Sequence, residues 1–303
     1  MSQSNSKYIR TIENDIKLKS QFFWDINDTE IQKFKNNFKN YNDEIAYFLL
    51  DMMVYYNANH CREITNTAIY ELKRNIWLKA LKNGNNFNNS EEIDRYTHEY
   101  LSNSFIFPVS NIEESGKSAE LLEGYYKESP IDFVPVNNYK SLSALTEIIA
   151  INKPKSIIFV DDIIGTGNQF CKFFSKTKHF NLDATIEMCV NNNKDIDFYY
   201  VVFASDEKAL NDLNKKYKNL KIISVEVFSL EDRITNKNNE YWEIYNVYND
   251  FMKDLKKIEK DFPRKCKYSL DLPILYVSGR AQNTSFEYFW NSYDNTWNVL
   301  KAR

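Results

Sequence analysis

Two adjacent carboxylates followed by a glycine-rich turn form the segment of this 303-residue chain that is best suited to chemistry. The run 157–170 begins with apolar residues, continues with Asp161 and Asp162, and then reaches Gly165-Thr166-Gly167. The glycines permit positive φ angles and let backbone N–H groups approach an anion closely. Carboxylates beside such a turn suit vicinal sugar hydroxyls or a Mg²⁺ ion that offsets phosphate charge. The segment therefore indicates a site for a phosphorylated sugar or a nucleotide.

A buried strand and a helix must position this turn. The run 156–160 is continuously apolar after Ser156, which is typical of a strand buried on both faces of a parallel sheet. A helix is predicted from Asn168 to about His179, and its N-terminus would offer unpaired N–H groups to a phosphate. Adjacent residues of a straight strand point to opposite faces, so we expect the acids to reach one ligand only where the chain turns at the strand end.

The rest of the chain predicts an α/β fold with a phosphoribosyltransferase-like parallel sheet flanked by helices. Strands and helices alternate along the middle of the chain, which is typical of βαβ units. The predicted strands cover 104–109, 156–160, 198–204 and 221–228, and the predicted helices between them cover 114–126, 142–149, 168–179 and 205–217. Three regions are expected: an α-helical region over 1–100 that begins with a polar arm of about 20 residues, an α/β core over 101–235, and a long helix (240–262) with an irregular C-terminal hood within 236–303.

Composition excludes several classes of protein. The net charge is −3, and 16% of the residues are aromatic, so we expect a folded protein without broad nucleic-acid binding. The four cysteines and three histidines show no metal-ligand spacing, which suits a reducing, cytoplasmic compartment. The longest apolar run, 45–56, contains Asp51 and is shorter than the ~20 residues that span a bilayer, so we expect a buried helix and no membrane partner.

The core segment resembles the phosphoribosyl pyrophosphate (PRPP) signature of type I phosphoribosyltransferases, in which two acids between apolar pairs precede a Thr-Gly turn. The resemblance implies that Asp161 and Asp162 contact the ribose hydroxyls, directly or through Mg²⁺. It also implies that the 5′-phosphate lies against Ile164, Gly165, Thr166, Gly167, Asn168 and Gln169. Members of the family commonly have Thr or Ser where this chain has Gln169.

A wider pattern is similar to the divergent phosphoribosyltransferase-like family of bacterial conflict systems, including retron-associated effectors. The shared features are a helical N-terminal extension, a Ser-Gly element at Ser115 and Gly116, the Asp-Asp-x-x-Gly-Thr-Gly-Asn-Gln core, and a tail ending in Trp and Arg; in this family Gln169 is typical. The resemblance implies a pyrophosphate loop at Ser115, Gly116 and Lys117, although a plain helix cap explains these residues equally well. It also implies a hood over the base in which Arg280 contacts a phosphate or the base.

Three functional interpretations remain open from the sequence. The first is an enzyme that uses PRPP or a nucleotide with Mg²⁺ in glycosyl chemistry, as an effector of an anti-phage defence system. The second is a catalytically inactive sensor or scaffold that binds the same ligand. The third is docking of a protein or ribonucleoprotein partner through the aromatic-rich N-terminal helices. No histidine lies near the acids, so the sequence names no general base.

Overall fold

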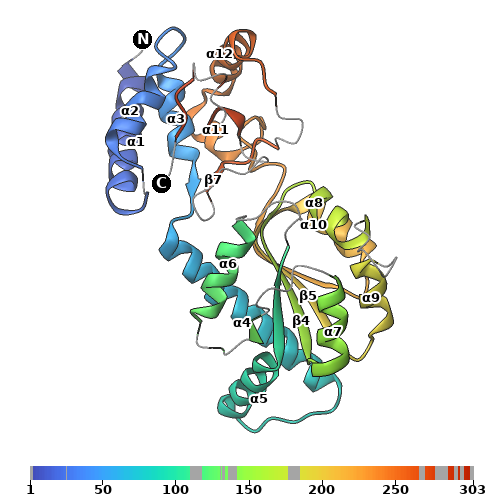
Figure 1. Cartoon of the computed structure of the whole chain (residues 1–303). Coiled ribbons are helices and arrows are strands. Elements are labelled where there is room, and N and C mark those ends of the chain that lie inside the picture. The colour runs from blue at the N-terminus through green and yellow to red at the C-terminus, as the bar shows by residue number, and fades with distance from the viewer. Residues whose placement is uncertain are drawn as a thin grey trace. The chain divides into compact units, whose positions relative to one another are not determined.

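The computed structural model divides the chain into two compact units, His60–Val227 and a second that combines Met1–Asn59 with Phe228–Arg303 (Figure 1). It describes residues 3–24, 26–109, 118–129, 131, 134–135, 142–176, 185–265, 270–276, 286–289, 293 and 297–300. These units cut across the three regions predicted from the sequence, because the two ends of the chain share one unit.

A five-stranded sheet in the order β3-β2-β4-β5-β6 forms the centre of the unit His60–Val227. The strands β2, β3, β4 and β5 pair in parallel. Their bounds are β2 Ser104–Pro108, β3 Val134–Pro135, β4 Ser156–Ile164, β5 Asp197–Asp206 and β6 Lys221–Phe228. Every residue of β2 is buried, as expected for a strand covered by helices on both faces. The predicted α/β fold with a parallel sheet flanked by helices is thus confirmed.

Helices cover both faces of this sheet (Figure 1). Side chains alternate along each strand, so Phe159 and Tyr200 enter one core while Ile158 and Tyr199 enter the other. The first core is closed by α7 (Leu142–Asn152), α8 (Asn168–Cys171) with the π-helix Lys172–Lys176, α9 (Ile186–Asn192) and α10 (Glu207–Lys216). The second is closed by α4 (Ala58–Lys82), α5 (Ser90–Ser102) and α6 (Ser118–Lys127).

The other unit is mainly helical and has its own aromatic core. Its elements are α1 (Gln3–Phe22), α2 (Asp28–Asn36), α3 (Glu44–Met52), α11 (Glu240–Tyr245), α12 (Tyr248–Asp261), the parallel pair β1 (Val54–Tyr55) and β7 (Ile274–Tyr276), and a 3₁₀ turn at Glu287–Phe289. Trp297 is buried there and its Nε1 donates to the carbonyl of Tyr288 at 2.9 Å. This tryptophan therefore packs the tail onto a core.

Two predicted elements of this unit were wrong. The N-terminal segment that was expected to be a polar arm forms the helix α1, in which Ile12 and Ile16 lie one turn apart and bury their side chains. Lys19 adds an anchor, since its Nζ lies 2.8 Å from Oδ1 of Asp51 on α3. The single long helix predicted over 240–262 is two helices, because Asn246 adopts a left-handed conformation with φ 51° and ends α11.

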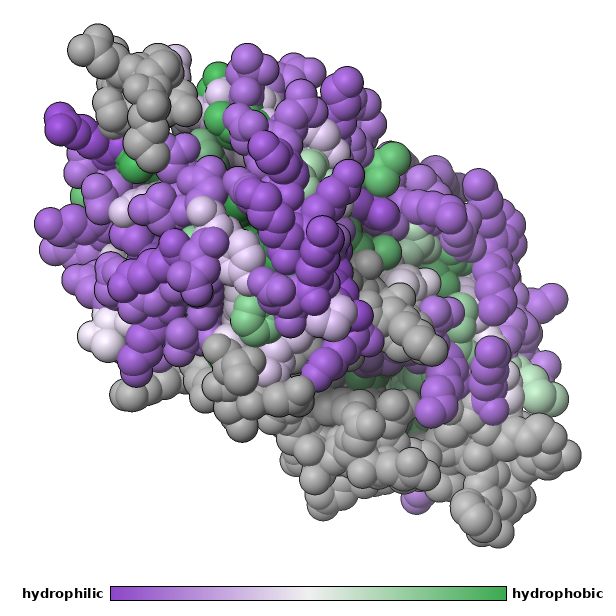
Figure 2. All heavy atoms as spheres, turned by 90° about the horizontal axis from the view of Figure 1, so that it is seen from above, coloured by the Kyte–Doolittle hydropathy of each residue, from purple (hydrophilic) through white to green (hydrophobic). Residues whose placement is uncertain are grey.

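The surface of the described residues is largely hydrophilic. Figure 2 shows polar and charged side chains over most of the described surface in that view, with apolar residues in small separate groups. None of the described helices combines the length and the apolar character needed to cross a bilayer.

Candidate functional site

Strand β4 continues through both acids and ends at Ile164, four residues beyond the predicted strand end. Asp161 and Asp162 are 2% and 3% exposed. Asp161 Oδ1 accepts a hydrogen bond from Asp162 N at 3.0 Å, and Asp162 Oδ1 accepts one from Ile163 N at 2.7 Å. These local bonds fix one oxygen of each carboxyl group along the chain, and the two groups are close enough for the charge of Asp162 to raise the pKa of Asp161. One ligand at the strand end would therefore meet both acids.

The Asp161 carboxyl also has a partner on the neighbouring strand. The hydroxyl of Tyr200 on β5 donates to its Oδ2 at 3.2 Å. Burial and the negative charge of Asp162 raise the pKa of Asp161 well above its usual range. Burial and the charge of Asp161 likewise raise the pKa of the Tyr200 phenol. Two buried carboxyls in contact behave as a pair that retains a proton more readily than free carboxyls do.

This raised pKa makes the stability of the fold depend on pH. The folded Asp161 binds its proton more readily than the unfolded residue does, so stability falls as pH rises from about 4 through the folded pKa. Asp161→Asn removes this titration. We expect the variant to gain stability over wild type as pH rises, by up to about 1.4 kcal/mol per pH unit within that window. Urea denaturation at a series of pH values measures the difference.

Asp197, at the start of β5, is the matched control for this experiment. Burial alone would raise its pKa, but hydrogen bonds from Lys79 and Tyr100 lower it. Asp197→Asn should therefore lose stability relative to wild type as pH rises towards 4, the opposite sign. A pH-independent difference between Asp161→Asn and wild type would contradict the raised pKa.

The turn after β4 has the conformation that its glycines allow. Gly167 has φ 71°, in the left-handed region, and is the N-cap of α8. Thr166, Asn168 and Gln169 are exposed, and the Asn168 N–H donates weakly to Thr166 Oγ1 at 3.4 Å. The helix that follows is α-helical over fewer residues than predicted. The α-helix α8 covers Asn168–Cys171, and the chain continues as the π-helix Lys172–Lys176. The predicted helix end near His179 lies outside the described residues.

Gly167 is restricted both by its backbone and by its neighbour. A Cβ added there would lie 3.3 Å from the Leu213 side chain on α10, and the left-handed backbone disfavours any L side chain. We expect Gly167→Ala to lower the free energy of unfolding by about 2 kcal/mol and to weaken PRPP binding, because the turn must shift. Urea denaturation and calorimetric titration measure the two effects.

Gly84 provides the control for Gly167, because it shares the left-handed backbone but lies in open space. Its φ is 85° and no atom lies within 4 Å of an added Cβ. Gly84→Ala should cost about 1 kcal/mol and leave ligand binding unchanged. Equal losses of stability in both variants, with unchanged affinity in Gly167→Ala, would show that contact with Leu213 does not position the turn.

An aromatic stack anchors the helix that follows the turn. The rings of Phe170 and Tyr200 lie 3.9 Å apart and are inclined by 14°. Phe174, one turn later, stacks on Phe170 at 5.0 Å. Because the same Tyr200 donates to Asp161, the stack connects the first turn after the glycines directly to the acid pair.

The structure adds residues that the sequence did not single out. Tyr200 supports Asp161, and Ser205 and Asp206 lie at the end of β5, where Ser205 is paired in register with Ile164. Asp206 is the N-cap of α10 and accepts from Ala209 N at 3.1 Å, so this helix begins two residues later than the predicted range 205–217. The predicted contacts Ser115, Gly116, Lys117 and Arg280 lie outside the described residues, so their roles stay predictions.

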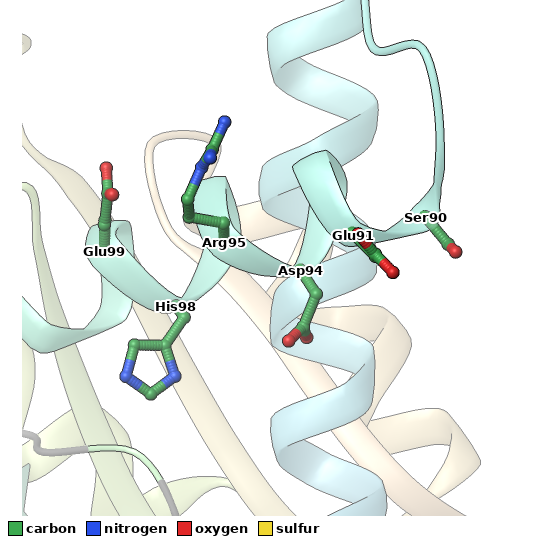
Figure 3. A pocket seen from close by; sticks show the side chains of 6 residues that line it. All are labelled: Ser90, Glu91, Asp94, Arg95, His98 and Glu99. Carbon is green, nitrogen blue, oxygen red and sulfur yellow. The ribbon is translucent and has the colours of Figure 1, made fainter.

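A hollow of about 590 Å³ on α5 does not assemble a comparable site. All six lining residues come from this one helix, namely Ser90, Glu91, Asp94, Arg95, His98 and Glu99. Figure 3 shows Arg95 and Glu99 pointing one way while Asp94 and His98 point another. Asp94 is already paired with Lys73. The hollow is thus a charged helix surface, and the end of β4 remains the better candidate.

One family model covers most of the chain. A model of the PRTase-CE family matches residues 31–303. Among solved structures, the orotate phosphoribosyltransferase from Aeropyrum pernix is similar at 14% identity and a TM-score of 0.24, over 52% of this chain and 78% of that one. No curated protein matches the chain.

Proposed function

The chain belongs to the PRTase-CE family, and from this premise we propose that it binds PRPP or a related nucleotide with Mg²⁺ at the carboxyl end of β4. The observation that carries the proposal is the buried pair of Asp161 and Asp162, followed within three residues by a glycine turn with a left-handed Gly167. Parallel sheets bind ligands at this edge, beyond the carboxyl ends of their strands.

Each part of the site suits one part of the ligand. Backbone N–H groups of Gly165–Gly167 and the exposed Thr166 hydroxyl would hold the 5′-phosphate. The acid pair would accept hydrogen bonds from the ribose hydroxyls, and Asp161 would be held in place for this by Tyr200. Asn168 and Gln169, both exposed, would complete the rim of the phosphate site.

The acid pair also fits the chemistry of a Mg²⁺ ion. Among the described residues no group of three His, Cys, Asp or Glu side chains could hold a metal on its own. Mg²⁺ in proteins is commonly bound by only one or two carboxylates together with substrate phosphates and waters. Asp161 and Asp162 would supply those carboxylates after losing their retained proton, and bound Mg²⁺ would offset the negative charge of a pyrophosphate group.

If the chain turns over PRPP, the reaction is a displacement at the anomeric carbon of the ribose. The bond to pyrophosphate breaks, taking its electron pair with the leaving group, and a bond to the acceptor forms. The residues of this chain would contribute by fixing the ribose and the phosphate and by placing negative charge near the developing positive charge of the sugar ring. Such a reaction would make the protein a glycosyl-transferring or nucleotide-cleaving effector.

A second candidate function is a sensor or scaffold that binds without turnover. The observation that favours it is the buried state of Asp161, whose carboxyl already contacts Tyr200 and Asp162. A carboxyl engaged in this way is suited to support a binding site rather than to act as a base. Both candidates use the same pocket, so they differ in the fate of the ligand.

The biological setting of the proposal is bacterial anti-phage defence, within the cytoplasm. It is supported by the resemblance of the motif and tail to the conflict-system family, including retron-associated effectors. A protein or ribonucleoprotein partner would then control the activity. The net charge of −3 supports a specific partner over broad nucleic-acid binding.

Calorimetric titration of the wild-type chain with PRPP and common nucleotides, each with Mg²⁺, tests the proposal. Saturable binding is expected, and an assay for released pyrophosphate or free base then separates the two candidates. Binding with release supports the enzyme, and binding without release supports the sensor. Absence of binding by any of these ligands would contradict the proposed site.

A further inference from the structure

Ser205, at the end of β5, carries a buried hydroxyl that no described part of the chain uses. Its residue exposure is 0%, and its Oγ has no hydrogen-bond partner among the described residues. Buried hydroxyls nearly always have a partner, because losing water without replacing its hydrogen bonds is costly. A buried hydroxyl without such a partner at the end of a parallel strand is a candidate contact for a group that is supplied from outside the protein.

The position of Ser205 identifies where that group would be. Its Cα is paired with that of Ile164, the residue directly before the Gly165–Gly167 turn. Neighbouring strands lie about 4.8 Å apart, so the backbone of Ser205 lies beside the start of the turn. The other side of the turn is closed by Leu213 of α10, which begins two residues after Ser205. The serine thus lies in the corner formed by β4, β5 and the turn.

We propose that Ser205 Oγ donates a hydrogen bond to the phosphate group of the bound sugar phosphate. This inference rests on the proposed function and names a contact from the neighbouring strand. A phosphate oxygen is an acceptor only, and a hydroxyl with no acceptor of its own is a suitable donor to it. Bonds of this kind to a charged group are stronger than bonds between neutral groups.

A serine at the other end of the strands separates a role in ligand binding from a structural role. Ser156, the first residue of β4, is also fully buried, but its Oγ donates to Ser104 Oγ at 2.7 Å, and Ser104 donates onward to the carbonyl of Tyr100. Removing the Ser156 hydroxyl breaks a bond in the folded protein. Removing the Ser205 hydroxyl breaks no hydrogen bond among the described residues and relieves a donor that they leave unmet.

The experiment compares Ser205→Ala with Ser156→Ala by thermal unfolding without ligand and by calorimetric titration with ribose 5-phosphate and with PRPP and Mg²⁺. We expect Ser205→Ala to raise the Tm by about 2–4 °C and to weaken the binding of both ligands about tenfold or more. Ser156→Ala should lower the Tm and leave both affinities unchanged.

The outcomes distinguish a failure of the Ser205 contact from a failure of the proposed function on which it rests. If wild type binds neither ligand, the proposed function fails and this contact fails with it. If wild type binds and Ser205→Ala binds equally well, only the Ser205 contact is overturned. A lowered Tm in Ser205→Ala with unchanged affinity would show that a buried water or another group of the protein satisfies the hydroxyl, which also overturns it.

Discussion

Replacing both acids of β4, Asp161→Asn together with Asp162→Asn, is expected to weaken the binding of PRPP with Mg²⁺ by at least about 30-fold. The amides keep the size of the side chains but remove the charge that, in the proposed function, would bind Mg²⁺ and accept from the ribose hydroxyls. Removing one partner of a buried charged contact typically costs about 2–5 kcal/mol of binding free energy. Calorimetric titration measures the loss, and a thermal unfolding curve verifies that the variant is folded.

Asp206 offers a control with the same chemistry at the same edge of the sheet. It is 4% exposed, and its carboxylate accepts from Ala209 N as the N-cap of α10. Asn caps a helix about as well as Asp does, so Asp206→Asn should keep both the fold and the affinity. A loss of affinity as large as that of the double variant would mean that general negative charge, rather than the acid pair, governs binding.

The single substitutions divide the roles of the two acids. Asp161 is held by Tyr200, whereas Asp162 accepts from its own neighbour Ile163. A larger loss in Asp162→Asn would identify Asp162 as the main ligand contact and Asp161 as its support. Equal losses would indicate that the pair acts as one unit, in keeping with the effect of the Asp162 charge on the pKa of Asp161.

The sequence predicted the order of strand, acids and glycine turn well, because that signal is local. The acids, the turn and the strand before them follow one another without interruption, so their relative position depends on a single βα connection. Tyr200 and Ser205 were not singled out, because they lie beside β4 only through its pairing with β5. Strand order follows from contacts between distant segments, and one sequence contains no record of it.

The errors in the helical unit have a similar cause. The segment that forms α1 is polar on average, so its two buried isoleucines did not outweigh the many charged and amide side chains around them. The apolar residues of 240–262 keep an almost helical spacing across Asn246. The helix α11 ends there only because this one residue has a left-handed backbone, so the spacing predicted a single helix. Local patterns also cannot show that both ends of the chain build one unit.

The stability of the site depends largely on one aromatic side chain. Tyr200 donates to Asp161 with its hydroxyl and stacks on Phe170 with its ring. The acid pair and the first helical turn after the glycines are therefore held by the same side chain. A change in this stack should affect ligand binding without any direct contact with the ligand.

Phe170→Ala is the variant that tests this coupling, and its expected effect on stability is the largest of those considered. Phe170 is 1% exposed and packs on Tyr200, Phe174 and Tyr217. Truncating a buried phenylalanine costs about 3–5 kcal/mol, and the freed Tyr200 ring would let Asp161 move. We expect PRPP affinity to fall about tenfold or more under conditions where the variant remains folded.

Phe174→Ala makes the coupling measurable, because it removes an equally buried ring from the same core one turn further from the glycines. It should lose a similar free energy of unfolding, by urea denaturation, while keeping most of the affinity for PRPP with Mg²⁺. Phe170→Leu should restore much of the stability but not the affinity, since a leucine fills space without stacking on Tyr200. If both alanine variants lose affinity in proportion to their stability, the stack serves only the core, and the acid pair must be positioned by β4 alone.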